Sequence, residues 1–424
     1  MRKRLLPILL IFLVSSILRF YKFGQVPAGL SLAEVNFGQK LTILGTWVLN
    51  PILIRIPFAI LGIVSVLLLY QFVKKISGDR NLALVSGLTL SIIPWHIEES
   101  RVFSWEIIFL TLSLFVGVYS ADWIKLHYKN FLKYIILICV LIFCFSVVKN
   151  AGQAGARVDV ERTEISMISR GLPVRFLSNK FIEGFRVAEK KLFENLDFGT
   201  YFFAGHPRER WGMPESNKIY LFMLPLIVFG ISKIDKRLGI ILAVWTFLAF
   251  FTSSILLLAP AVILISIGIV KISQNKQFSS KVFVLLLAGL GIYEFLNVNY
   301  LYFGGFSESI FSPRRPAFAE VTRLVSGLRK NGEQVLVSEK LGTPEVFFKF
   351  YLKNKTFDYE FRDFDIRRET DRNKLFVDAI SDEPKPTEPL FADGGKFPPN
   401  IDALATFEDR GMRQKIVVYR VKLK

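Results

Sequence analysis

The segment between the first two apolar runs of the sequence, residues 23–50, carries one acidic residue, Glu34. A Pro-Ala-Gly turn precedes a run of helical period, which places Glu34 roughly one turn into a short helix. We expect this helix to lie flat on the outer face of a membrane. A carboxylate held at a membrane surface is a candidate functional group that can accept a proton. The alternative is a solvated surface glutamate.

A second polar group follows Pro94 and Trp95, where one apolar run ends and the next begins. It contains an imidazole, two carboxylates and a guanidinium within six residues: His96, Glu98, Glu99 and Arg101. The guanidinium of Arg101 at a helix start beside the head-group layer suits bidentate binding of a lipid phosphate. An interfacial anchor paired with Glu98 or Glu99 is the alternative role of Arg101. His96 taken alone is more typical of a capping or packing histidine than of a catalyst.

The third polar group lies in residues 201–214, directly before the apolar run that begins near Lys218. Its cationic or titratable side chains are His206, Arg208 and Arg210, in a stretch interrupted by Gly and Pro. Such a stretch beside a membrane entrance can hold an anionic head group, although most charge runs are only solvated. Upstream, residues 157–191 have the pattern of an amphipathic helix on the membrane, with these apolar residues facing it: Phe176, Phe181, Phe185 and Leu192.

Composition places these groups in a polytopic membrane protein. The chain has 424 residues, 52% hydrophobic content and 41 Phe, with a positive mean hydropathy. Both cysteines, Cys139 and Cys144, fall in one apolar run, and only three histidines occur. We therefore expect no disulfide framework, metal site or cofactor. The net charge of +18 is spread among apolar segments, which indicates anionic membrane lipids and not nucleic acid as partner.

The apolar runs predict nine membrane spans, since each is of spanning or near-spanning length. They cover residues 5–20, 56–73, 81–95, 103–123, 134–148, 218–234, 238–252, 254–271 and 281–297. The pair at 238–271 is separated only by Thr252-Ser253-Ser254. The first run resembles a signal peptide but lacks a small-residue cleavage site, so we interpret it as a retained span.

The positive-inside rule predicts the orientation of the spans. Five basic ends or loops fall on one side, the cytoplasmic one: residues 1–4, 74–80, 125–133, 233–237 and 271–281. The N-terminus is then cytoplasmic, and residues 22–55, 96–101, 149–217 and the segment after Asn297 face outward. We expect a multi-pass protein of the cell membrane with an extracytoplasmic C-terminal part.

The C-terminal part is compositionally distinct, with charges mixed throughout and helical and strand patterns alternating. Helices are predicted at 316–330 and 343–353, and strands at 334–338 and 415–421. An aromatic stripe in the second helix is more typical of a core than of a sugar platform: Phe347, Phe348, Phe350 and Tyr351. Residues 383–399 are Pro-rich and predict a loop. The predicted fold is thus an α-helical polytopic membrane domain, residues 1–297 with outer loops 22–55 and 149–217, followed by a small extracytoplasmic α/β domain, residues 298–424.

Three stretches together resemble the phospholipid-carrier-dependent glycosyltransferases of the GT-C superfamily, which includes protein O-mannosyltransferases and lipid A aminoarabinose transferases. They are LRFYKFGQVPAGLSLAEVNFGQ, the long segment from RIPFAILG to PWHIEESRVFSWE, and FFAGHPRERWGMPESNKIYLFMLPLIVFGI. The resemblance implies a cavity at the outer face where a sugar moves from a polyprenyl phosphate to an envelope acceptor, which is a lipid, a glycan or a protein.

The family's first outer loop usually carries Asp-Glu, and the Asp serves as general base. That Asp matches Ala33 here, so Glu34 is the catalytic candidate, with His96, Glu98 or Glu99 as substitutes on the same face. For an active glycosyltransferase, the candidate phosphate or lipid-head contacts are Arg55, Arg101, His206, Arg208 and Arg210. Two other departures are Trp211 at the position of the family's histidine and a missing pair of spans before the long loop.

Two functions from different classes follow. One is an active membrane glycosyltransferase whose partners are a polyprenyl-phosphate-linked sugar, anionic lipids and an envelope acceptor. The other is a catalytically silent relative that binds a polyprenyl-phosphate lipid or scaffolds an envelope complex. A transporter is disfavoured because no apolar run carries paired charges or a helix-breaking midpoint.

Overall fold

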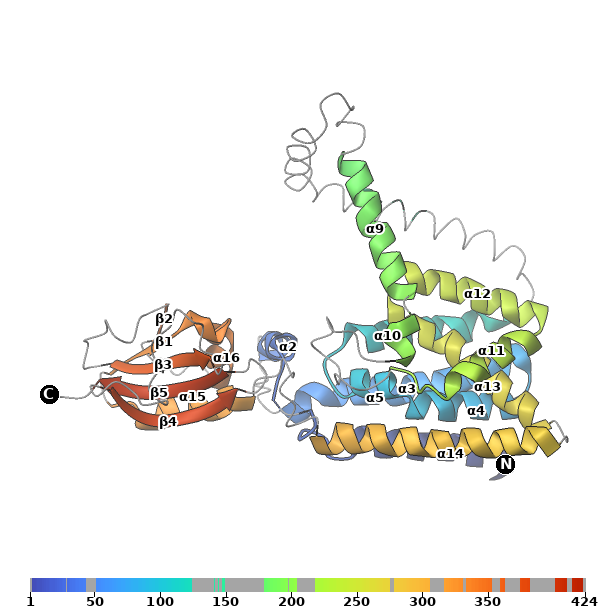
Figure 1. The fold of residues 1–424 in the computed structure, drawn as a ribbon, viewed down its shortest axis with the longest axis horizontal. Helices are drawn as coiled ribbons and strands as arrows, with labels where there is room; N and C mark the ends of the chain where they lie inside the picture. The colour runs from blue at the N-terminus through green and yellow to red at the C-terminus, as the bar shows by residue number, and fades with distance from the viewer. Residues whose placement is uncertain are drawn as a thin grey trace.

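The computed structural model describes residues 2–27, 29–42, 51–123, 179–196, 198–203, 218–274, 278–305, 316–330, 333–352, 359–362, 374–381, 401–409 and 414–421, with isolated positions from 141 to 148. These residues form a bundle of apolar helices and, beyond one end of the bundle, a five-stranded sheet with two helices (Figure 1). The chain is therefore mostly helical with a small sheet, as the sequence predicts at this level.

Four helices in the described part of the chain are long and apolar enough to cross a membrane: Pro51–Ser77, which is α3, Trp105–Trp123, Ser254–Gln274 and Val282–Gly304. The last two contain α13 (Leu258–Gln274) and most of α14 (Phe278–Tyr300). Leu6–Phe20, within α1 (Arg2–Phe20), and α11 (Met223–Lys233) are shorter apolar helices. Most of the predicted span at 134–148 lies outside the described residues. The total of nine spans stays a prediction.

The apolar run at 81–95 is divided between two helices. Helix α4 (Arg80–Ile92) ends before Ile93, whose backbone is extended, and Pro94 opens the short α5 (Pro94–Ser100). Proline disfavours a helical conformation in the residue before it and cannot donate to the preceding turn. Helix α4 has 13 residues, about 20 Å of helix, which is less than the roughly 30 Å of a bilayer's hydrocarbon core. The break places the residues of α5 at the end of the bundle near the sheet.

The slight break at Thr252 to Ser254 is present. Helix α12 (Lys236–Phe251) has Thr252 as its C-cap, and a 3₁₀ turn, η1 (Ser254–Leu257), leads into α13. Helices α11 and α13 approach very closely, because a Cβ at Gly230 would lie 2.1 Å from the carbonyl oxygen of Leu264. Small residues allow this backbone approach between helices in a membrane.

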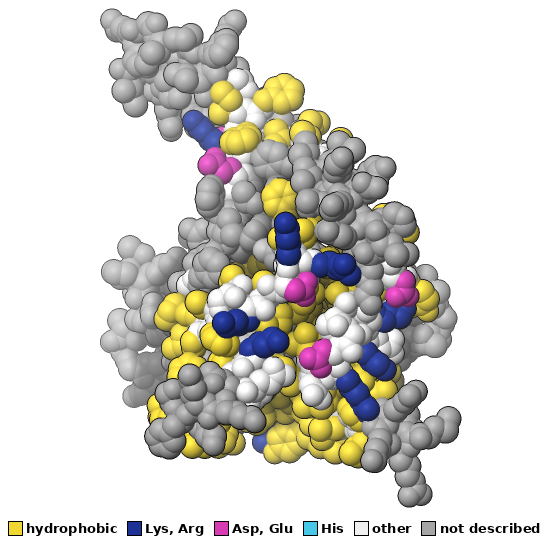
Figure 2. All heavy atoms as spheres, turned by 90° about the vertical axis from the view of Figure 1, so that its right-hand side faces the viewer, with side chains coloured by type: hydrophobic (Ala, Val, Ile, Leu, Met, Phe, Trp, Pro, Cys, Tyr) yellow, Lys and Arg dark blue, Asp and Glu magenta, His cyan; other side chains and the backbone are white. Residues whose placement is uncertain are grey.

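The end of the bundle away from the sheet is basic, and Figure 2 views the molecule from this side. Lysine or arginine lies at the helix ends that meet there: Lys74 and Lys75 of α3, Arg80 of α4, Lys233 of α11, Lys236 and Arg237 of α12, and Lys271 of α13. The same face carries a few carboxylates (Figure 2), and Lys75 pairs with Asp122 across 3.5 Å. This distribution is the one that the positive-inside rule associates with a cytoplasmic surface; the orientation itself stays a prediction.

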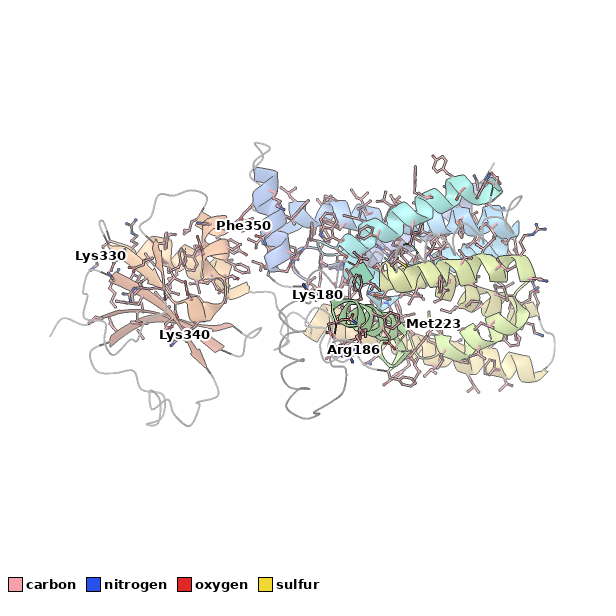
Figure 3. The ribbon with its side chains drawn as sticks, turned by 90° about the horizontal axis from the view of Figure 1, so that it is seen from above. Lys180, Arg186, Met223, Lys330, Lys340 and Phe350 are labelled. Carbon is pink, nitrogen blue, oxygen red and sulfur yellow. The ribbon has the colours of Figure 1, made fainter. Side chains whose placement is uncertain are left out.

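Helix α2 (Leu32–Thr42) lies across the other end of the bundle, between the bundle and the sheet (Figures 1 and 3). Helix α9 (Lys180–Leu196) projects from the side of the bundle and is followed by α10 (Phe198–Phe202) (Figure 1). Phe181 and Phe185 of α9 are exposed, which suits an amphipathic helix with an apolar face for lipid. Phe176 lies outside the described residues.

The sheet has the strand order β2-β1-β3-β5-β4. Its strands are β1 (Gln334–Val337), β2 (Tyr359–Phe361), β3 (Lys374–Ser381), β4 (Ile401–Asp409) and β5 (Gln414–Val421). Strand β1 runs parallel to β2 and β3, whereas β5 is antiparallel to β3 and β4. Helices α15 (Pro316–Leu328) and α16 (Pro344–Leu352) pack on the face formed by these side chains: Val335, Val337, Leu375, Val377, Ile416 and Val418. We call the five strands with these two helices the sheet unit.

Most of the aromatic stripe of α16 belongs to this core. Phe347, Phe348 and Phe350 are buried, and Phe347 and Phe348 pack against Phe318 of α15. Tyr351 is half-buried. The predicted helices and the two predicted strands of this region are present within a few residues of their expected bounds, whereas the Pro-rich stretch 383–399 lies outside the described residues. The domain boundary near residue 297 stays a prediction.

Candidate functional site

Glu34 occupies the third helical position of α2, and its carboxylate is fixed by the start of that helix. The backbone N–H of Ser31 donates to Oε2 of Glu34 across 2.8 Å, and the backbone N–H of Glu34 donates to the hydroxyl of Ser31 across 3.2 Å. These reciprocal bonds form a capping box, which satisfies amide donors that a helix start leaves without intrahelical partners. Glu34 therefore has a structural role, whatever chemistry it performs.

The same carboxylate forms a buried ion pair with Arg55 of α3. The Nε atom of Arg55 lies 2.8 Å from Oε1 of Glu34, and the side chains of Glu34 and Arg55 are 0% and 1% exposed. The guanidinium also donates to the carbonyl oxygens of Pro27 and Gly29. Arg55 thus holds the turn before α2 as well as Glu34. A solvated Glu34 is wrong, because the turn and α3 enclose its carboxylate.

Arg101, at the C-cap of α5, holds the end of α1 and the turn that follows. Its Nη1 donates to the carbonyl oxygens of Leu18 and Arg19 across 3.0 and 2.8 Å, and its Nη2 donates to those of Lys22 and Val26 across 3.3 and 2.8 Å. The aromatic rings of Phe23, Tyr302 and Phe303 lie near the guanidinium, the nearest centroid at 4.9 Å. This is the geometry of an anchor, built on carbonyl oxygens in place of the expected Glu98 or Glu99. Phosphate binding by Arg101 stays a prediction.

His96 of α5 lies in a buried chain of hydrogen bonds. Its Nδ1 faces Nη2 of Arg19, and its Nε2 lies 2.8 Å from the hydroxyl of Ser65, which donates to the carbonyl oxygen of Gly62. Because a guanidinium can only donate, Nδ1 must accept and Nε2 must carry the proton. Burial first, and then the charge of Arg19, hold the pKa of His96 below its usual value. His96 is thus a neutral packing histidine in this arrangement.

Among the described residues, three guanidiniums at the sheet end of the bundle are fully buried, and we call Arg19, Arg55 and Arg101 the arginine cluster. Sequence reasoning missed Arg19 because it treated this residue only as the end of the first span. The available signal was a guanidinium in the last turn of an apolar helix, where cations interact favourably with the helix dipole. Glu34 neutralises Arg55, so Arg19 and Arg101 are the buried cations of the cluster that give this end of the bundle a positive interior, which attracts anions.

The remaining site residues lie at different depths. Glu98 and Glu99 are half-buried, and Ala33 is exposed on α2. His206, Arg208 and Arg210 lie outside the described residues, as does Trp211. Two separate pairs are formed: Glu34 contacts Arg55, and His96 contacts Arg19. Within the described ranges, no group of three or more His, Cys, Asp or Glu side chains could hold a metal ion.

Comparison with known proteins bears on the helices that carry this site. Residues 39–149 match the family model of dolichyl-phosphate-mannose-protein mannosyltransferases. The match is consistent with a GT-C superfamily glycosyltransferase. It spans α3, α4, α5 and the helix Trp105–Trp123, and so includes Arg55, His96 and Arg101, but it begins after Glu34. Among curated proteins, no sequence matches the chain.

The family match and the apolar helices together support a membrane glycosyltransferase of the mannosyltransferase type at a coarse level. The family's description implies a dolichyl-phosphate-linked sugar as donor together with an acceptor substrate.

Proposed function

We propose that this protein is a membrane glycosyltransferase that moves a sugar from a polyprenyl-phosphate carrier to an envelope acceptor outside the cytoplasm. In this reaction the bond from the anomeric carbon to the carrier phosphate breaks, and a bond from that carbon to an acceptor oxygen forms. The acceptor proton goes to a carboxylate of the protein, and the polyprenyl phosphate leaves. The observation that carries the proposal is the family match over residues 39–149, which includes α3 and α5 with Arg55 and Arg101 but not α1 with Arg19.

The positive interior of this end of the bundle supports the proposed donor. A leaving phosphate gains negative charge in the transition state, and preorganised cationic groups stabilise it. Arg55 and Arg101 are proposed as such groups, with His206, Arg208 and Arg210 of the outer loop as contacts to the lipid head. Arg101 already bonds to carbonyl oxygens, which carry no net charge, so we propose that it acts at a distance, by charge, more than by direct contact. Arg55 is paired with Glu34, so its charge becomes available only if Glu34 accepts the acceptor proton.

The general base is proposed among Glu34, Glu98 and Glu99. Glu34 lies next to the position of the family's Asp and is fixed by its capping box, but its carboxylate is buried. Glu98 and Glu99 are half-buried and so are easier for an acceptor to reach. Catalytic hydrogen bonds often tighten only when substrate is bound, so the burial of Glu34 in the absence of substrate does not exclude it as the general base.

The test is a transfer assay on the protein reconstituted in lipid nanodiscs, with a panel of radiolabelled polyprenyl-phosphate sugars and an envelope lipid extract as acceptor. We expect labelled product with at least one donor, and a loss of roughly a hundredfold in turnover when the base is changed to Gln. Glu34→Gln, Glu98→Gln and Glu99→Gln are compared with the exposed control Glu345→Gln. Arg55→Gln breaks the same ion pair as Glu34→Gln without removing a carboxylate, so it separates a base from a structural glutamate.

A specific observation favours the second function, a silent relative that binds the lipid or scaffolds an envelope complex. The position of the family's Asp is occupied by Ala33, which is exposed on α2, while the adjacent Glu34 is buried. Ala33→Asp tests it, because a carboxylate there would point away from the buried pair. Transfer that appears only in Ala33→Asp supports a silent native protein. Absence of transfer from every donor in both proteins, with polyprenyl phosphate still bound, contradicts the enzyme.

A further inference from the structure

Helix α16 of the sheet unit contacts α2 at the turn of that helix just beyond Glu34. A Cβ at Gly38 would lie 2.8 Å from Cε2 of Phe350, so the ring of Phe350 rests directly on the backbone of α2. Figure 3 shows Phe350 between α16 and α2. The side chain of Gln39 donates to the carbonyl oxygen of Val346 across 3.1 Å, which adds a polar contact one residue further along α2.

The hydrophobic core of the sheet unit continues at this point into α2, the turn before it and α3. Leu30, Val35 and Ile54 belong to the same buried cluster as Phe350 and the strands of the sheet. Val35 follows Glu34 and Ile54 precedes Arg55 in the sequence, so the ion pair adjoins a core that α16 helps to complete. Removing a buried ring such as Phe350 from a packed core leaves a cavity and loosens its neighbours.

Tyr351 follows Phe350 in α16, the helix that contacts α2 just beyond Glu34, and the centroids of the two rings lie 5.2 Å apart. Burial, together with the negative charge of Glu34 and against the positive charge of Arg55, raises the pKa of Tyr351 to about 12. The phenol is therefore protonated at neutral pH and can donate a hydrogen bond. Its hydroxyl is not among the described buried polar atoms that lack a partner, and the residue is half-buried.

From these contacts we propose that α16 is part of the candidate site. Phe350 holds α2 through Gly38, and Tyr351 supplies a hydroxyl beside Glu34 and Arg55 that meets an oxygen of the incoming sugar or acceptor. Phe350 is a positioning residue, and Tyr351 is a substrate-binding residue. The candidate site is thus built from two parts of the molecule: the helix bundle with α2 supplies Glu34 and Arg55, and the sheet unit supplies Phe350 and Tyr351. The role of the Tyr351 hydroxyl rests on the proposed function, whereas the contact between Phe350 and α2 does not.

The first experiment measures amide hydrogen exchange of the full chain in nanodiscs. Phe350→Ala removes the ring, and Gly38→Leu inserts a side chain where the ring rests, leaving the strands of the sheet untouched. We expect exchange in α2 to rise roughly tenfold or more in both variants, while β3 and β5 stay protected in Gly38→Leu. Phe283→Ala on exposed α14 is the matched control. Unchanged exchange of α2 in both variants would overturn the contact.

The second experiment places 3-fluorotyrosine at position 351 and follows its ionisation by fluorine NMR. Removing the negative charge in Glu34→Gln stabilises the phenolate, so the titration midpoint should move to lower pH, while Glu345→Gln leaves it in place. An unmoved midpoint in Glu34→Gln would overturn the placement of Tyr351 beside the pair.

The third experiment compares sugar transfer by the native protein and by Tyr351→Phe. We expect KM for the donor or the acceptor to rise about tenfold with unchanged exchange in α2, since only a hydrogen bond is removed. Equal KM and kcat in both proteins would overturn the role of the hydroxyl. If the native protein transfers no sugar, the proposed function and that role fail together, and the first two experiments still decide whether α16 adjoins the pair.

Discussion

Two carboxylate–guanidinium pairs, one in each part of the molecule, share their chemistry but differ in burial. Glu34 and Arg55 are 0% and 1% exposed at the end of the bundle. Glu333 and Arg420 in the sheet unit are 6% and 20% exposed. In the second pair, Nε and Nη2 of Arg420 donate to the two carboxylate oxygens across 2.6 and 2.8 Å. Both glutamates also accept a backbone N–H, from Ser31 and from Lys330.

The difference is in what each pair costs when broken. A buried ion loses its hydration and depends entirely on its partner, so removal of one member leaves an uncompensated charge. A pair with access to water is partly solvated and screened when its partner is removed. We therefore expect the Glu34–Arg55 pair to control the integrity of the bundle end, and the Glu333–Arg420 pair to tune the sheet unit.

The largest effect is expected at the buried pair. Glu34→Gln and Arg55→Gln should each destabilise the bundle by about 3–5 kcal/mol, because each leaves one buried group unpaired. The double variant with Gln at both positions should recover part of this loss. Thermal unfolding in nanodiscs measures it. A single variant within 1 kcal/mol of the native protein would show that water reaches the site and would remove the distinction between the two pairs.

The next effect concerns Arg101, a buried cation held by carbonyl oxygens. Arg101→Lys keeps the charge but cannot reach four carbonyl oxygens in the planar arrangement of a guanidinium. We expect a loss of about 2–3 kcal/mol and faster amide exchange in the turn after α1. Lys22→Arg, on the exposed side of the same turn, is the control. If Arg101→Lys has native stability but binds polyprenyl phosphate more weakly, Arg101 is a direct phosphate ligand and not an anchor.

A smaller, pH-dependent effect is expected in the sheet unit. Burial alone would raise the pKa of Glu333, but hydrogen bonds from Arg420 and Lys330 and their charges outweigh it, and the pKa lies below its usual 4.5. The folded pKa is lowered, so the pair stabilises the unit above the pKa of the unfolded carboxyl, and this stabilisation is lost as pH falls through the folded value.

Exchange of β1 and β5 amides, followed from pH 7 to pH 3, measures the contribution of Glu333. Glu333→Gln should cost about 1–2 kcal/mol at pH 7 and abolish most of the acid dependence. An acid transition of the same size in Glu333→Gln would assign it to other carboxylates.

The smallest effect is expected at the exposed pair of Glu345 and Lys349 on α16, whose side chains are 53% and 68% exposed. Lys349→Gln should change the stability by no more than about 0.5 kcal/mol, and the change should vanish at high salt. Chemical denaturation at low and high salt measures it. A loss above 1 kcal/mol would mean that the exposure of an ion pair does not predict how much it contributes to stability.

The sequence by itself indicated much of the local structure. The apolar pattern predicted strands at 334–338 and 415–421, close to β1 and β5, whereas the break that Pro94 makes between α4 and α5 fell inside a single predicted span, 81–95. The three-residue spacing of Ser31 and Glu34 is the sequence signature of a capping box. We did not predict the box, because Glu34 was considered only as a possible base or a surface residue. Strands β2, β3 and β4 were not predicted; β2 has three residues, which are too few to show a period.

Tertiary structure alone decided which partners the charged side chains take. Glu34 and Arg55 are 21 residues apart, and Arg101 reaches carbonyl oxygens 75 to 83 residues away. Neither distance leaves a periodic pattern in the sequence, since the contacts depend on how α1, α3 and α5 pack together. The contact of Phe350 with Gly38 is of the same kind. The sequence pattern places Phe350 on the apolar face of its helix, but only the packing shows that its ring contacts α2 as well as the core of the sheet unit.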